Sequence, residues 1–72
     1  PSLEDAYAAL GVSADAPDSE EKRAYRRLMS QNHPDKLSAR GVPEEMLRLA
    51  TEKSQEIQAA YEMVRKARGS RR

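Results

Sequence analysis

Apolar residues recur every three or four positions over most of this chain, which is the spacing that places side chains on one face of an α-helix. Over residues 3–10 the apolar positions include Tyr7 and Leu10. Gly11 follows directly, and glycine readily adopts the left-handed geometry found at helix ends. We therefore expect a short first helix over residues 3–10, followed by a turn-rich connection.

A second helix is predicted over residues 18–32. At 100° per residue, Ala24, Tyr25 and Leu28 share one face, so this face should pack against the rest of the protein. The helix should end before Pro34, because proline disfavours helical geometry in the residue that precedes it.

The start of this second helix carries the pattern of a capping box. Asp18 is suited to cap the free amide groups, and Glu21 follows three residues later. Glu21 also falls on the core-facing side of the helix. The capping role would offer its carboxylate a partner there.

A longer third helix is predicted over residues 43–67, after a loop at residues 33–42. Pro43 suits the first position of a helix, and the two glutamates that follow it complement the positive N-terminal end. A short tail is expected at residues 69–72. The apolar residues that follow helical spacing are Met46, Ala50, Ile57, Ala60, Tyr61 and Val64.

These elements predict an all-α domain in which the second and third helices form an antiparallel hairpin and the first helix fills the remaining apolar groove. Because the third helix is the longer, its first turns should extend beyond the hairpin loop. We expect Met46, Leu47 and Leu49 of these turns to form a small apolar cluster that braces the loop. Leu37 and Val42 are the loop residues available to meet them.

Composition narrows the class of protein. Seventy-two residues allow a single domain, 1–72, with a thin core. The chain has no cysteine, which excludes a disulfide and a thiolate zinc site. No apolar run is long enough to span a bilayer, and no signal peptide is visible.

Charge is balanced overall but unevenly placed. Thirteen basic and twelve acidic residues give a net charge of +1, whereas nucleic-acid-binding proteins normally carry a larger excess. Four cations lie opposite the apolar face of the second helix: Lys22, Arg23, Arg26 and Arg27. From composition alone, such a face suits a solvated surface as well as a binding surface.

The tripeptide His33-Pro34-Asp35, followed by Lys36, lies at the predicted tip of the hairpin. A triplet of this kind occurs by chance in many proteins, and a lone histidine is commonly an ordinary loop or cap residue. The context of this triplet is more specific. Residues 7–12 read Tyr-Ala-Ala-Leu-Gly-Val, residues 22–28 read Lys-Arg-Ala-Tyr-Arg-Arg-Leu, and residues 56–62 read Glu-Ile-Gln-Ala-Ala-Tyr-Glu.

These four elements, in this order, resemble the J domain of the DnaJ-type co-chaperones, and the resemblance covers residues 3–64. One subgroup is especially similar, the membrane-anchored DjlA type. The similarity lies in residues 28–30, in residues 33–37 and in a longer insertion with Gly41 and Pro43. In that type the J domain is the C-terminal, cytoplasmic part of a longer protein anchored in the inner membrane, and we expect the same placement here.

Three positions depart from the family pattern. Glu21 stands where the family usually has an apolar residue, and Ser54 stands where ordinary J domains have a phenylalanine. Asn32 replaces an aromatic residue common before the triplet. The first two are expected to weaken the core, and none alters the triplet or the basic face.

The resemblance implies a domain that is not an enzyme and that stimulates ATP hydrolysis by a DnaK-class chaperone. The basic helix would dock on an acidic surface of the partner, and Asp35 would accept paired hydrogen bonds from a partner arginine. Pro34 would stiffen the turn, and His33 would either fix the loop or meet the partner. The residues assigned to partner binding are His33, Pro34, Asp35, Lys22, Arg23, Tyr25, Arg26, Arg27 and Lys36.

No catalytic residue, cofactor or metal ligand is assigned, and we expect a monomeric domain that contacts neither nucleic acid nor membrane. Two rival functions stay open. A basic helix could lie along nucleic-acid phosphates, although its face lacks the Asn or Gln that reads bases. A hydrolase could use His33 and Asp35, although the sequence shows no nucleophile beside them.

Overall fold

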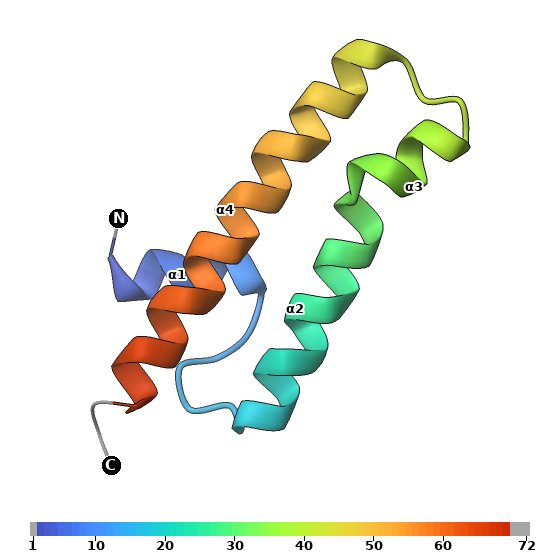
Figure 1. Ribbon diagram of the computed structural model, residues 1–72. Coiled ribbons are helices and arrows are strands. Elements are labelled where there is room, and N and C mark those ends of the chain that lie inside the picture. The colour runs from blue at the N-terminus through green and yellow to red at the C-terminus, as the bar shows by residue number, and fades with distance from the viewer. Residues whose placement is uncertain (1, 70–72) are drawn as a thin grey trace.

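The computed structural model describes residues 2–69 as an all-helical domain, which confirms the predicted fold class. Its helices are α1 (Leu3–Leu10), α2 (Asp18–Asn32), α3 (Pro34–Ala39) and α4 (Glu44–Gly69). Figure 1 shows α2 and α4 side by side and antiparallel, with α1 crossing the C-terminal half of α4. The short α3 continues from the end of α2 and leads over the tip of the hairpin.

Local interactions define α1 at both ends. Ser2 caps the helix by accepting a hydrogen bond from the Asp5 amide, and the Asp5 carboxylate accepts one in return from the Ser2 amide. Gly11 ends the helix in the left-handed region, at φ 70°, and its amide donates to the carbonyl groups of Tyr7 and Ala8. The first helix therefore occupies residues 3–10, the range expected from the sequence.

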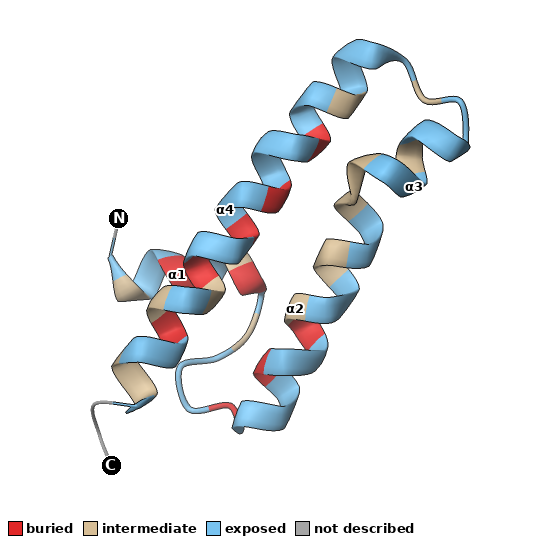
Figure 2. Ribbon diagram, in the orientation of Figure 1, coloured by how far each residue is buried: buried red, intermediate tan, exposed pale blue. Residues whose placement is uncertain are grey.

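The core lies where α1 meets α4. Leu10, Ile57 and Val64 are the largest fully buried side chains, and Ala6, Tyr7 and Ala60 complete the cluster. Figure 2 shows the buried positions of α4 in a line along the side that faces α1 and α2. Three half-buried residues of the hairpin, Tyr25, Leu28 and Tyr61, pack against this cluster.

The predicted capping box at the start of α2 is wrong. Pro17 occupies the cap position, and no side chain of the described residues caps this helix. Asp18 is the first helical residue, and its carboxylate pairs with Arg68 instead. Glu21 is 2% exposed and lies against the same guanidinium. A full positive charge attracts both carboxylates more strongly than the partial charges of free amides do.

The segment 33–42 is not a continuous loop, because α3 occupies most of it. Pro34 ends α2 and also starts α3, since its fixed φ angle suits the first position of a helix. The α4 helix runs to Gly69, slightly beyond the predicted end. Residues 70–72 of the expected tail lie outside the described residues.

The expected bracing cluster forms only in part. Met46 and Leu49 remain 52% and 51% exposed, so they do not brace the hairpin tip. Leu37, Val42 and Leu47 are half-buried there, where α3 packs against α4. These side chains stay exposed because α1 crosses only the C-terminal half of α4. The N-terminal half is covered on one side alone, by α3 and the end of α2.

Candidate partner-binding surface

The four cations of α2 share its exposed face. Glu21 and Ala24 are buried on the core-facing side of this helix, whereas Lys22, Arg23, Arg26 and Arg27 are all exposed. Within residues 2–69 none of these four cations makes an ion pair. The face is therefore available to an acidic partner, and little of its charge is neutralised locally.

The junction between α2 and α3 presents the triplet. His33 is both the last cap of α2 and the first cap of α3, with extended backbone angles of −70° and 121°. Its Nδ1 atom accepts a hydrogen bond of 3.3 Å from the Asp35 amide. Because Nδ1 accepts, the ring proton of the capping form resides on Nε2. His33 thus fixes the turn, which is one of the two roles left open by the sequence.

The Asp35 side chain projects into solvent from the first turn of α3. It is 93% exposed, and its Oδ2 atom lies 3.9 Å from His33 Nδ1. Lys36, the next residue, folds back toward α2, where its ammonium donates a 2.8 Å hydrogen bond to Ser30 Oγ. The backbone around Asp35 is constrained by the cap, whereas its carboxylate stays accessible.

A buried hydroxyl ties the end of α2 to α4. Ser54 is 6% exposed, and its Oγ atom donates a 2.9 Å hydrogen bond to the Asn32 carbonyl. This carbonyl belongs to the residue just before His33, and it lies at a helix end where carbonyl groups lack helical partners. The Asn32 amide side chain donates a further 2.8 Å bond to the Leu28 carbonyl. Ser54, a departure from the family pattern, therefore forms a polar tether between α4 and the backbone beside the triplet, whereas the Asn32 side chain bonds within α2.

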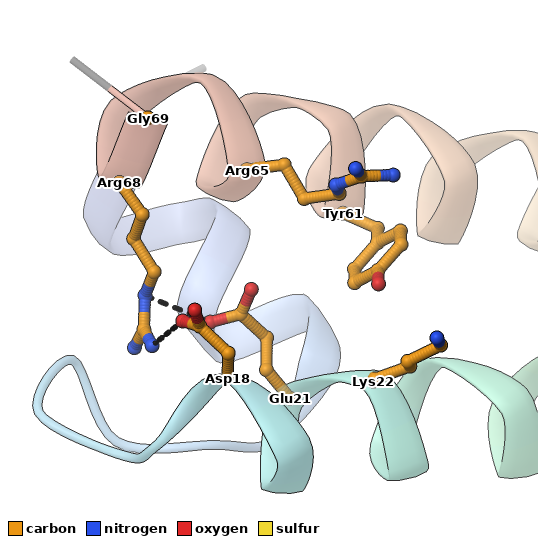
Figure 3. Close-up of a pocket in the computed structure, with 7 residues that line it drawn as sticks. All are labelled: Asp18, Glu21, Lys22, Tyr61, Arg65, Arg68 and Gly69. Atoms are coloured by element: carbon orange, nitrogen blue, oxygen red, sulfur yellow. Dashed lines mark hydrogen bonds and ion pairs between the residues drawn. The ribbon is translucent and has the colours of Figure 1, made fainter. Parts of the chain in front are cut away.

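Sequence reasoning missed the role of Arg68, a residue to which the sequence pattern assigned no partner. Figure 3 shows its guanidinium between α4 and the carboxylates of α2. It donates to Tyr7 Oη at 3.0 Å, to Asp18 Oδ1 at 2.6 Å and to the Ala14 carbonyl at 3.2 Å. Arg68 therefore joins α1, the α1–α2 connection and α2 to the last turn of α4.

Glu21 completes this cluster in an unusual way. Its Oε2 atom lies 2.9 Å from Arg68 Nε, but the single hydrogen on that nitrogen is donated to Tyr7, so the Glu21 oxygen has an ion pair without a hydrogen bond. Burial raises the pKa of the Glu21 carboxyl, while the positive charge of Arg68 opposes that shift. Hydrogen bonds to Tyr7 and Asp18 raise the pKa of Arg68. The available signal in the sequence was a glutamate on a core-facing position, because a buried carboxyl group is usually paired or hydrogen-bonded.

An aromatic pair closes the seam between α2 and α4. The rings of Tyr25 and Tyr61 stack with centroids 4.1 Å apart and an angle of 10° between their planes. Tyr25, which the sequence assigned to partner binding, is half-buried because of this stack. It lies beside the basic face and contributes to packing as well.

The fold, the basic helix and the triplet define a J domain, and comparison with known proteins agrees. The family described as DnaJ domain matches residues 5–71, so the chain belongs to this family. The chain is 59% identical over 66 residues to the co-chaperone protein DjlA of Coxiella burnetii, covering 92% of this chain and 24% of that protein. It is 60% identical over 67 residues to DjlA of Vibrio cholerae, with 93% and 24% covered.

DjlA of Shewanella oneidensis is 56% identical over 70 residues, which cover 97% of this chain and 27% of that protein. The similarity to the DjlA type expected from the sequence is thereby confirmed. The chain spans about a quarter of the length of the curated relatives it matches. No solved structure gives a significant match. In the described part of the chain, no helix combines the length and the apolar character needed to cross a bilayer.

Proposed function

We propose that this domain is a co-chaperone module that binds a DnaK-class chaperone and stimulates its ATP hydrolysis without catalysing a reaction itself. The observation that carries this proposal is the Asp35 carboxylate, 93% exposed at the hairpin tip on a turn that His33 caps. Membership of the DnaJ domain family and the co-chaperone names of the relatives support the same function.

In this mechanism Asp35 acts on the partner. An exposed carboxylate on a stiff turn accepts paired hydrogen bonds from an arginine, which are among the stronger polar contacts between proteins. Pro34 and the His33 cap lower the conformational entropy that the turn loses on binding. The domain accelerates hydrolysis by binding the hydrolysis-competent state of the chaperone more tightly than its other states.

In this proposal the basic face of α2 attracts the partner before contact. Its four exposed cations attract an acidic surface over a distance, which raises the association rate and fixes the orientation of the partner. Salt weakens such attraction, because exposed charges are screened beyond about 8 Å at physiological ionic strength. We place this encounter in the cytoplasm, with the domain acting as a monomeric unit of a membrane-anchored parent protein.

The test is single-turnover ATP hydrolysis by a DnaK-class chaperone with and without the domain. Asp35→Asn should abolish stimulation and leave helicity and the melting temperature nearly unchanged, because the carboxylate supports no core contact. Asp15→Asn is a matched control, since Asp15 is also an exposed aspartate but lies in the connection between α1 and α2. Full stimulation by Asp35→Asn, or none by the unmodified domain, would contradict the proposal.

A further inference from the structure

The C-terminal half of α4 carries three cations that differ in their surroundings. Arg68 is occupied by Tyr7, Asp18 and the Ala14 carbonyl. Lys66 lies 3.9 Å from Glu62, one turn earlier. The Arg65 guanidinium lies 5.7 Å from the centre of the Tyr61 ring, and among the described residues it has no ion pair. Arg65 is therefore the cation of this region that is held in place without being neutralised.

The ring beneath Arg65 belongs to the stacked tyrosine pair, so its position is fixed by both long helices. Tyr61 stacks on Tyr25 of α2 with centroids 4.1 Å apart. A guanidinium on a fixed aromatic ring loses fewer conformations on binding than a freely rotating side chain does. Arg65 thus extends from the seam between the helices in a restricted set of orientations.

Arg65 also continues the basic face of α2. Figure 3 shows Lys22 reaching from α2 and Arg65 reaching from α4 toward the Tyr61 side chain. The three residues line one hollow of ≈ 330 Å³. Its two carboxylates, Asp18 and Glu21, both lie against Arg68, which offsets one of their two negative charges. The charges of Lys22 and Arg65 are in excess over the other. Lys22 and Arg65 therefore give this end of the seam a net positive potential.

We infer that Arg65, supported by Tyr61, is a partner-contact residue that binds a carboxylate on the acidic surface engaged by α2. This inference rests on the proposed function, because the carboxylate belongs to the same DnaK-class chaperone. Arginine suits this role, since its planar fork binds a carboxylate through two parallel hydrogen bonds. No residue of α4 was assigned to partner binding from the sequence.

The position of Arg65 gives its contact with the partner a role that differs from the role of Asp35. Arg65 lies beside Lys22. Lys22 is separated from Asn32, the last residue of α2, by roughly 15 Å of helix at 1.5 Å per residue, with Asp35 beyond that end. Contacts at both ends of the hairpin would stop the domain from rotating about the triplet. Arg65 would therefore orient the bound domain, whereas Asp35 acts on the ATPase.

The test is the kinetics of binding to an immobilised DnaK-class chaperone in the ATP state. Arg65→Ala should weaken binding about tenfold, mainly through faster dissociation, which is the effect of losing one charge-assisted contact. Arg65→Lys should keep the association rate but recover the dissociation rate only in part, because lysine retains the charge without the planar fork.

Lys53→Ala is the matched control. Lys53 is an exposed cation of the same helix, and it lies roughly 120° around α4 from Arg65 at 100° per residue. The control should bind as the unmodified domain does, and helicity should be unchanged in all three variants.

Two outcomes would overturn the inference while leaving the proposed function in place, provided that the unmodified domain stimulates ATP hydrolysis and Asp35→Asn does not. In one, Arg65→Ala binds as tightly as the unmodified domain. In the other, Lys53→Ala weakens binding by the same factor, so that only net charge matters. Absence of any binding by the unmodified domain would overturn both the inference and the proposed function.

Discussion

The two ends of the helical hairpin are held together by different interactions. At the base, α1 covers α4, and the large side chains of Leu10, Ile57 and Val64 are fully buried. At the tip, the buried residues of α4 are the small Ala50 and Ser54, and polar contacts do much of the joining. Apolar packing therefore stabilises the base, whereas helix caps and hydrogen bonds between helices stabilise the tip.

This difference fits the placement of the proposed site. Segments with few buried apolar contacts open locally at lower free energy than the core does. The proposed function needs His33-Pro34-Asp35 exposed at the tip, so a further helix could not cover it. Hydrogen bonds of the Asn32 carbonyl, just before the triplet, and of the Asp35 amide, within it, then restrain the triplet without covering it. The comparison predicts that substitutions at the base unfold the domain and that substitutions at the tip loosen it.

The largest effect is expected at the base. Ile57→Ala removes a fully buried side chain from the contact of α1 with α4 and should lower the free energy of unfolding by about 3 kcal/mol. Urea denaturation followed by circular dichroism measures this change. A loss well below 1 kcal/mol, of the size typical of a surface position, would show that the base is not the stabilising region.

A smaller and more local effect is expected at the tether. Ser54→Ala leaves the Asn32 carbonyl without its hydroxyl donor and should cost about 1 kcal/mol. Amide exchange should accelerate in residues 33–39, and ATPase stimulation should fall. Thr51→Ala is the matched control, because the Thr51 hydroxyl also donates to a carbonyl but within α4, to Leu47. Equal exchange in the two variants would exclude the tether.

The buried carboxylate at the base predicts a dependence of stability on pH. The pKa of Glu21 is raised in the folded state above its ordinary value of 4.5, so the folded protein binds more protons at this group than the unfolded protein does. The contribution of Glu21 to stability is therefore largest below pH 4.5 and decreases as the pH rises through the folded pKa.

Glu21→Gln removes this titration. The unfolding free energy of the unmodified domain, minus that of the variant, should decrease as the pH is raised from 4 toward neutrality. Urea titrations across this range provide the measurement. A difference that increased with pH would mean that Arg68 outweighs burial and that the Glu21 pKa is lowered.

The smallest effect is expected at the exposed start of α4. Met46→Ala and Leu49→Ala should each change the free energy of unfolding by less than about 0.5 kcal/mol, because both side chains are about half exposed. Leu47→Ala should cost more, since Leu47 is half-buried where α3 packs against α4. Thermal unfolding of the three variants ranks them. Equal decreases in stability at all three positions would show that Met46, Leu47 and Leu49 brace the hairpin tip together.

Local patterns in the sequence were sufficient to predict α1, α2 and α4 and the position of the triplet. Gly11 ends α1, Pro34 ends α2, and the spacing of apolar residues orients each helix. These signals act on the backbone within a few residues, so they can be interpreted without the tertiary structure. The basic face was predicted for the same reason. The short α3 was missed because Pro34 was interpreted only as the end of one helix and not as the start of another.

Only the tertiary structure decided which distant polar groups meet. Glu21 pairs with Arg68, and Ser54 bonds to Asn32, a residue 22 positions away. The resemblance to the family identified Glu21, Ser54 and Asn32 as departures but gave no means of pairing them, because a contact between two helices depends on how far one is shifted and rotated along the other. The contact of Arg65 with the Tyr61 ring could not be predicted for the same reason, because Tyr25 of the neighbouring helix fixes that ring. Packing of α1, α2 and α4 sets that register, and the register decides which side chains become partners.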